Sequence, residues 1–189
     1  MLIDVINGFD FPGSAALVRA ATRVTPAIER LITRARALGV PVIYVNDNFG
    51  QWRSDFKSTV AGCTAPDQPG RLISARLEPQ SSDYFVLKPQ HSGFYSTTLD
   101  LLLTDLAVHT LVLAGFATNL CVQFTANDAH MRGYHLVVPR DCTASNSPGL
   151  TRVALSQLRG ALGAEVRRSA QIDFAALKRN RKKPIGQAF

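Results

Sequence analysis

Short runs of apolar residues alternate along the chain with longer segments in which apolar positions repeat every three to four residues. The apolar runs predict strands, and the amphipathic segments predict helices. The predicted strands cover residues 2–5, 40–46, 83–88, 109–115, 134–141 and 164–169. The predicted helices cover residues 14–38, 70–77, 96–106, 119–132 and 147–162. This alternation predicts parallel strands joined by right-handed crossovers, in an α/β, three-layer doubly wound (Rossmann-like) fold with a mainly parallel six-stranded sheet.

Ligands in doubly wound folds bind outside the carboxyl ends of the strands, so the residues that end each predicted strand are candidates for a site. Asp4 ends the first strand, Lys88 ends the third, and Cys121 follows the fourth. Lys88 is one of only two lysines before residue 178, in a chain whose basic residues are mostly arginine. A carboxylate, an ammonium group and a thiol therefore converge where a parallel sheet places an active site.

A thiol with the ordinary pKa of about 8.5 is mostly protonated at neutral pH and becomes a nucleophile when its surroundings favour the thiolate. We expect the positive end of the helix at residues 119–132 and the Lys88 ammonium to lower the pKa of Cys121, with Asp4 accepting the proton. The residues alone leave simpler interpretations open. A cysteine in an apolar helix is usually a small core residue, and a lysine at a strand end can reach solvent.

The length of 189 residues fits one domain, and a composition with 46% hydrophobic and 19% charged residues excludes intrinsic disorder. The net charge is +7, but residues 178–183 read KRNRKK, and removing these five charges leaves +2. We therefore predict a domain over residues 1–177 and a basic tail over residues 178–189. Nucleic-acid binding by the tail is the alternative to a solvated terminus, and it is disfavoured because no aromatic or groove-reading element accompanies the charges.

Three cysteines, Cys63, Cys121 and Cys142, are too few and too odd in number for a disulfide framework. We expect Cys142, at the end of the fifth predicted strand, to be structural, and Cys63 has no visible role. The sequence also has no apolar run of the roughly 20 residues that a membrane span needs, and no signal peptide at its start. These features predict a cytoplasmic protein with no membrane partner.

Four long segments carry a resemblance to a known family. They read LIDVINGFDFPG, VIYVNDNFGQWRSDF, VLKPQHSGFYSTTLDLLL and LVLAGFATNLCVQFTANDAHMRGYHLVVPRDCTAS. Over roughly residues 1–170 the chain resembles the isochorismatase-like cysteine hydrolases, which include nicotinamidases, N-carbamoylsarcosine amidase and ureidoacrylate amidohydrolases. The resemblance implies a catalytic aspartate at Asp4 rather than Asp10, a catalytic lysine at Lys88 and a nucleophile at Cys121.

The same resemblance implies further site residues. The cis peptide bond of the family corresponds to Phe116–Ala117, and the oxyanion donors would be the backbone N–H groups of Ala117 and Cys121. The substrate-facing segments of the family correspond to positions that include the only tryptophan of the chain and an arginine that could pair with a substrate carboxylate. These expected substrate-binding residues are Phe9, Asn48, Trp52, Arg53 and Phe116.

Two departures from the family narrow the expected chemistry. Related nicotinamidases hold a metal with an Asp-x-His pair after the second strand, whereas residues 46–49 read NDNF, and the four histidines His91, His109, His130 and His135 lack ligand spacing. We therefore expect no metal and no other cofactor, and nicotinamide is a disfavoured substrate. Isochorismatases that cleave a vinyl ether generally lack the nucleophilic cysteine, so Cys121 favours hydrolysis of an amide or carbamoyl C–N bond through a thioester.

Alternatives to that activity remain at this stage: a vinyl ether hydrolase of the isochorismatase type, or a catalytically silent binding protein on the same fold. The silent protein is disfavoured because Asp4, Lys88 and Cys121 are all present. The expected partners are a small-molecule substrate and further copies of the chain, since relatives of this kind are commonly dimers or tetramers. Relatives also usually have a few more residues before the opening strand, so we expect a short N-terminus that weakens this strand.

Overall fold

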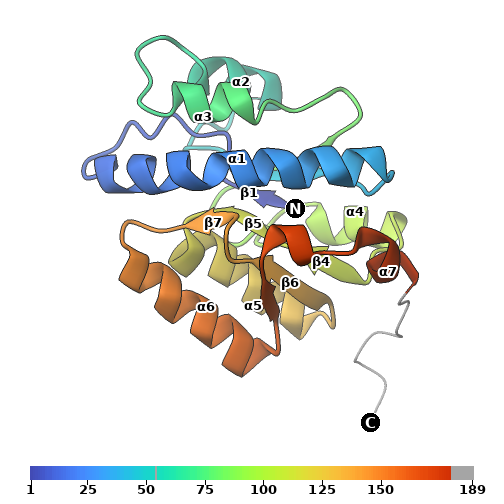
Figure 1. The fold of residues 1–189 in the computed structure, drawn as a ribbon. Helices are drawn as coiled ribbons and strands as arrows, with labels where there is room; N and C mark the ends of the chain where they lie inside the picture. Colours follow the sequence, from blue (N-terminus) through green and yellow to red (C-terminus); the bar gives the residue numbers. More distant parts are fainter. Residues whose placement is uncertain (54, 180–189) are drawn as a thin grey trace.

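The computed structural model describes residues 1–53 and 55–179, and Figure 1 shows how their elements are arranged. The strands are β1 Leu2–Ile3, β2 Ile43–Asp47, β3 Tyr84–Lys88, β4 Thr110–Val112, β5 Ala114–Phe116, β6 His135–Pro139, β7 Thr143–Ala144 and β8 Glu165–Arg167. The helices are α1 Ala15–Ala37, α2 Phe56–Cys63, α3 Arg71–Arg76, α4 Leu99–Asp105, α5 Gln123–Met131, α6 Pro148–Leu162 and α7 Phe174–Arg179. A π-helical turn, η1 Thr118–Val122, precedes α5, and a 3-10 turn, η2 Ser169–Gln171, precedes α7.

The strands pair in parallel in two hydrogen-bonded groups, with orders β3-β2-β1-β5-β7 and β4-β6-β8. The groups meet at Leu113, where the fourth predicted strand divides into β4 and β5. The Leu113 N–H donates to the Val137 carbonyl, while the next N–H, that of Ala114, donates to the Met1 carbonyl. The α/β class and the parallel strands are confirmed, and the hydrogen bonding forms a five-stranded and a three-stranded sheet where one sheet of six was expected.

Helices cover both faces of the strands, as a doubly wound fold requires. Figure 1 shows α1 on one side and α4, α5 and α6 on the other. On the first side, buried side chains of α1 pack against strand and loop residues such as Val5 and Tyr44. On the second, buried side chains of α4, α5 and α6 pack around Val45 and Val86. The core therefore has two halves, one on the α1 face of the strands and one on the α4, α5 and α6 face. Loops connect the elements at the ends of the strands.

Most predicted helices are present with shifted ends, and some short elements were missed. Helix α2 lies between the second predicted strand and the helix predicted at residues 70–77, where no element was predicted, and it begins where the Asp55 side chain accepts the Ser58 N–H at 2.7 Å. The short strand β7 and helix α7 were not predicted either. The predicted basic tail begins within α7, and residues 180–189 lie outside the described residues. In the part of the chain that the structure describes, no helix is long and apolar enough to cross a membrane.

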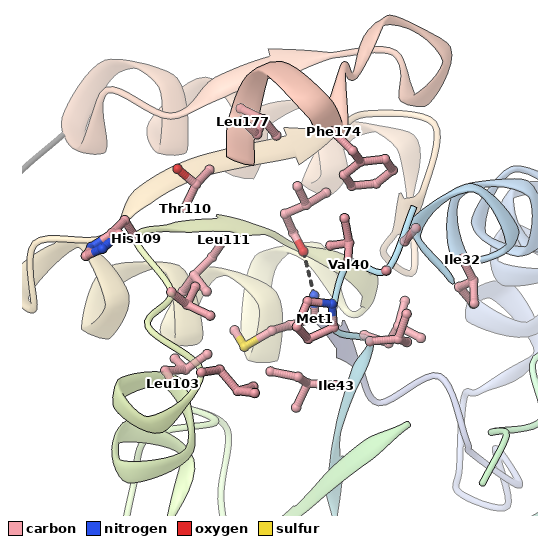
Figure 2. A pocket seen from close by; sticks show the side chains of 18 of the residues that line it. Met1, Ile32, Val40, Ile43, Leu103, His109, Thr110, Leu111, Phe174 and Leu177 are labelled. Carbon is pink, nitrogen blue, oxygen red and sulfur yellow. Dashed lines mark hydrogen bonds between the residues drawn. The ribbon is translucent and has the colours of Figure 1, made fainter. Parts of the chain in front are cut away.

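A cavity of about 460 Å³ lies at the amino ends of β1, β2 and β4. Figure 2 shows its mainly apolar lining, which includes Val40, Ile43, Leu111 and Phe174. The amino group of Met1 donates to the Val112 carbonyl at 2.7 Å beside it. This cavity, named the amino-edge cavity below, opens at the opposite ends of the strands from Asp4 and Lys88.

Candidate active site

Asp4 directly follows β1 and is almost fully buried, with 5% of its surface exposed. Its backbone lies in the left-handed region with φ at 51°, a conformation that costs a residue other than glycine about 1 kcal/mol. The Asp4 N–H donates to the Val45 carbonyl at 3.0 Å, and its Oδ1 accepts the Asp47 N–H at 2.7 Å. These bonds to β2 hold the carboxylate at the carboxyl edge of the sheet.

Lys88 is the last residue of β3, and its side chain is completely buried. Its Nζ lies 3.0 Å from Asp4 Oδ2, 3.4 Å from Asp47 Oδ2 and 3.6 Å from Cys121 Sγ. Burial disfavours the charged ammonium, but the neighbouring Asp4 carboxylate and Cys121 outweigh it, and the pKa of Lys88 stands above its ordinary value. A buried cation is tolerable only with such partners, so Lys88 remains charged between two carboxylates.

Cys121 lies in the η1 turn, which follows β5 directly. The Phe116–Ala117 peptide bond, where the resemblance places a cis bond, is cis. The Ala117 carbonyl accepts the N–H groups of Leu120 at 3.1 Å and Val122 at 3.2 Å, which closes the turn. The thiol is free and partly exposed. The turn therefore brings the nucleophile candidate and the two proposed oxyanion donors, Ala117 and Cys121, into one short segment.

The electrostatics of the thiol differ from the sequence-based expectation. Burial, with the Asp4 charge as the next cause, raises the pKa of Cys121 to about 12, although Lys88 acts to lower it. The expected lowering by a helix start and a lysine is therefore wrong for this state, because the desolvation of the sulfur is larger than either effect. Burial also raises the pKa of Asp4, against the influence of Lys88, and the Asp4 and Cys121 side chains are hydrogen-bonded. The resting site thus holds a neutral thiol next to a proton acceptor.

Two residues near the thiol were not expected in the site. The Asp47 carboxylate is the second partner of Lys88, and its only sequence signal was its position at the end of the second strand. The Nδ1 atom of His91 lies 4.0 Å from Cys121 Sγ. The linear spacing of the histidines could not reveal this contact, because it depends on how the loop after β3 folds back over the η1 turn. Among residues 1–53 and 55–179, no group of three or more histidine, cysteine, aspartate or glutamate side chains is arranged to hold a metal ion.

The five expected substrate-binding residues fall into two groups. Phe9 and Phe116 are buried, with ring centroids 6.0 Å apart, and Asn48 is buried with its Oδ1 accepting the Gly50 N–H at 2.9 Å. Trp52 is 78% exposed and Arg53 is also exposed. The structure therefore brings Phe9 and Phe116 together in the α1 half of the core, and it places Trp52 and Arg53 on the surface of the loop after β2.

Comparison with known proteins identifies a family that covers both the fold and the candidate site. A family model described as the isochorismatase domain matches residues 1–171, the part of the chain that contains Asp4, Lys88 and Cys121. The chain belongs to the isochorismatase family. The resemblance found in the sequence and the expectation of an isochorismatase-family hydrolase are both confirmed.

The relatives cover most of the chain. The uncharacterised isochorismatase family protein YaaI of Bacillus subtilis (strain 168) is 40% identical over 172 residues, 91% of this chain and 94% of that protein. The ureidoacrylate amidohydrolase RutB of Yersinia enterocolitica is 30% identical over 79% of this chain and 70% of its own length. The crystal structure of N-carbamoylsarcosine amidase from Thermoplasma acidophilum superposes with a TM-score of 0.70 at 28% identity, covering 91% of this chain and 96% of that one. This isochorismatase-family chain therefore has relatives named as amidohydrolases.

Proposed function

We propose that this chain is a cysteine-dependent amidohydrolase that cleaves an amide or carbamoyl C–N bond of a small molecule through a thioester intermediate. One observation carries the proposal. The Lys88 ammonium lies within 3.0 Å of the Asp4 carboxylate and within 3.6 Å of the Cys121 sulfur, at the carboxyl edge of a parallel sheet. A base, a cation and a nucleophile in mutual contact are what acyl transfer requires.

The first half of the reaction forms the acyl-enzyme. Asp4 takes the proton from the Cys121 thiol while the sulfur attacks the carbonyl carbon of the substrate. Lys88, which faced the Asp4 carboxylate, then balances the negative charge as it passes to the sulfur. The carbonyl oxygen becomes an oxyanion that accepts hydrogen bonds from the N–H groups of Ala117 and Cys121. When the intermediate collapses, the C–N bond breaks and Asp4 returns the proton to the leaving nitrogen.

The second half releases the acid product. Asp4, again a carboxylate, takes a proton from a water molecule that attacks the thioester carbonyl. The C–S bond breaks, and the proton held by Asp4 returns to the sulfur. The raised thiol pKa supports this order of events, because a sulfur with a pKa of about 12 receives its proton back readily and rests as a thiol. The enzyme thus forms the thiolate only when a substrate can take up its charge.

The substrate class is tested with a panel of simple amides, N-carbamoyl amino acids and ureido acids, with release of ammonia or amine as the measurement. The last two groups follow the named substrates of the relatives, ureidoacrylate and N-carbamoylsarcosine. We expect the wild type to hydrolyse members of the panel and Cys121→Ala to hydrolyse none.

Cys63→Ala is the matched control, since Cys63 is a buried thiol in the α1 half of the core. We expect this variant to retain the activity of the wild type. Hydrolysis by Cys121→Ala at the rate of the Cys63→Ala variant would exclude the covalent mechanism.

A further inference from the structure

The loop between β3 and α4 is tied to the helix that continues from the nucleophile turn. The Ser92 hydroxyl donates to the Asp128 carboxylate, and the Gly93 N–H donates to the Thr125 hydroxyl at 2.9 Å. Gly93 also approaches the core so closely that a Cβ atom there would lie 2.7 Å from a methyl group of Val45. Asp128 and Thr125 both belong to α5, so the loop has a fixed position relative to Cys121, which lies just before that helix.

His91 is held between this anchor and the buried Lys88. Its Nδ1 lies 4.0 Å from Cys121 Sγ, and its ring packs against Phe124, with centroids 5.4 Å apart and planes tilted by 32°. Phe124 is a residue of α5, so the helix after the nucleophile supports the imidazole. His91 is exposed, whereas Asp4 and Lys88 are buried. The sulfur therefore has its base and cation on the protein side and an imidazole on the solvent side.

A substrate must approach the sulfur from the side that is open to solvent. In a near-attack arrangement its carbonyl carbon lies about 3–3.5 Å from the sulfur, which is close to the separation of the sulfur and the imidazole. A group attached to that carbon can therefore reach hydrogen-bonding distance of His91 when the substrate lies along the imidazole side of the sulfur. Imidazole carries at least one N–H donor in every protonation state, so it suits a hydrogen-bond acceptor on the substrate.

We infer that His91 is a substrate-contacting residue that binds a hydrogen-bond acceptor of the substrate near the scissile carbonyl, and that the preferred substrates of this enzyme carry a carboxylate as that acceptor. The inference rests on the proposed function, because it assumes that Cys121 attacks the carbonyl. It assigns to His91 the selection of the substrate, and to Asp4 and Lys88 the activation of the thiol. A substrate without such an acceptor binds more weakly and reacts more slowly at the same cysteine.

Two alkylating agents of similar size test the inference without knowledge of the substrate. Iodoacetate and iodoacetamide both alkylate a cysteine: the C–S bond forms, iodide leaves, and the thiol proton passes to Asp4. Iodoacetate carries a carboxylate on the reacting carbon, and iodoacetamide carries a neutral amide. Peptide mapping of Cys121 gives the rate for each reagent, and the ratio of the two rates measures recognition of the carboxylate separately from reactivity of the thiol.

Three variants separate the hydrogen bond from the shape of the side chain. His91→Phe keeps a planar ring against Phe124 but removes both nitrogens, and we expect it to lower the iodoacetate-to-iodoacetamide ratio by about tenfold. His91→Gln keeps a donor and should recover part of the ratio. His130→Phe replaces another exposed histidine, near the end of α5, and should leave the ratio at the wild-type value. In turnover with a carboxylate substrate from the panel, His91→Phe should raise KM by a similar factor.

The outcomes distinguish this inference from the proposed function. An unchanged ratio and an unchanged KM in His91→Phe, with Cys121 alkylated and essential for hydrolysis, would overturn the role of His91 alone. Equal slowing with both reagents would also overturn it, because His91 would then act on the thiol and not on the carboxylate. Failure of both reagents to label Cys121, together with hydrolysis by Cys121→Ala, would overturn the proposed function and this inference with it.

Discussion

The two ends of the parallel strands carry opposite kinds of side chain. At the carboxyl ends, Lys88 forms ion pairs with Asp4 and Asp47 beside the thiol of Cys121. At the amino ends, the amino-edge cavity of about 460 Å³ is lined mainly by aliphatic side chains. The apolar cavity and the charged cluster therefore lie at opposite ends of the strands. Charge and hydrogen bonding, and not this cavity, mark the candidate active site.

This contrast predicts that substitutions at the carboxyl edge change activity, whereas substitutions at the amino edge change stability. Lys88→Met should have the largest effect. Without the ammonium, the carboxylates of Asp4 and Asp47 face the sulfur with no cation between them, and the thiolate loses its balancing charge. We expect kcat/KM to fall by about a thousandfold or more on the best substrate of the panel.

Lys57→Met is the matched control for Lys88→Met, because Lys57 is the other lysine before residue 178 and is exposed. It should keep the activity of the wild type. Circular dichroism of Lys88→Met shows whether the fold persists, since breaking a buried ion pair also costs about 3–5 kcal/mol of stability. A folded Lys88→Met variant with wild-type kcat/KM would contradict the proposed role of the lysine.

The amino edge should respond in the opposite way. Leu111 in β4 is buried, and its side chain borders the amino-edge cavity. We expect Leu111→Ala to enlarge that cavity and lower the free energy of unfolding by about 3 kcal/mol. Because the substitution lies at the far ends of the strands, kcat/KM at 25 °C should remain within about twofold of the wild type. Denaturant unfolding and a parallel activity assay measure the two quantities, and a large loss of activity in folded protein would break the contrast.

The pH dependence gives a smaller but more specific effect. Asp4 acts as a base only when it is ionised, so kcat/KM should rise with pH as Asp4 loses its proton. Burial raises the pKa of Asp4, so the midpoint of this rise should lie above the ordinary aspartate value of about 3.9. A pH–rate profile, with circular dichroism to verify that the protein stays folded, checks the sign. A midpoint at or below the ordinary value would assign the base to a different, more exposed carboxylate.

The sequence predicts the charged residues at the carboxyl edge but does not predict the cavity at the amino edge. Asp4, Lys88 and Cys121 could be found because each follows a strand, and parallel strands bring their carboxyl ends together. The amino-edge cavity could not be found, since it depends on how the side chains of α1, α4 and α7 pack over the strand starts. The division of the fourth strand at Leu113 could not be predicted from the apolar residues either. An apolar run has the same sequence pattern whether or not the strand changes its hydrogen-bonding partners within the run.

Within the site, the missed features are those that depend on contacts between distant segments. Asp47 and His91 were visible as residues, but their contacts with Lys88 and Cys121 join segments that lie far apart in the sequence. The thiol pKa was expected to fall because a lysine and a helix start were apparent in the sequence, whereas the desolvation that raises it requires the folded surroundings. Residue types thus indicate the candidate groups, and packing decides their resting protonation states.

The covalent intermediate is the central claim, and rapid-quench mass spectrometry tests it most directly. The wild type is mixed with its best substrate from the panel and acid-quenched within the first turnover, and the peptide that contains Cys121 is analysed. The account predicts an added acyl group on Cys121 that forms as the amine is released and disappears as the acid product accumulates. Amine release with an unmodified Cys121 peptide at every time, together with hydrolysis by Cys121→Ala, would contradict it.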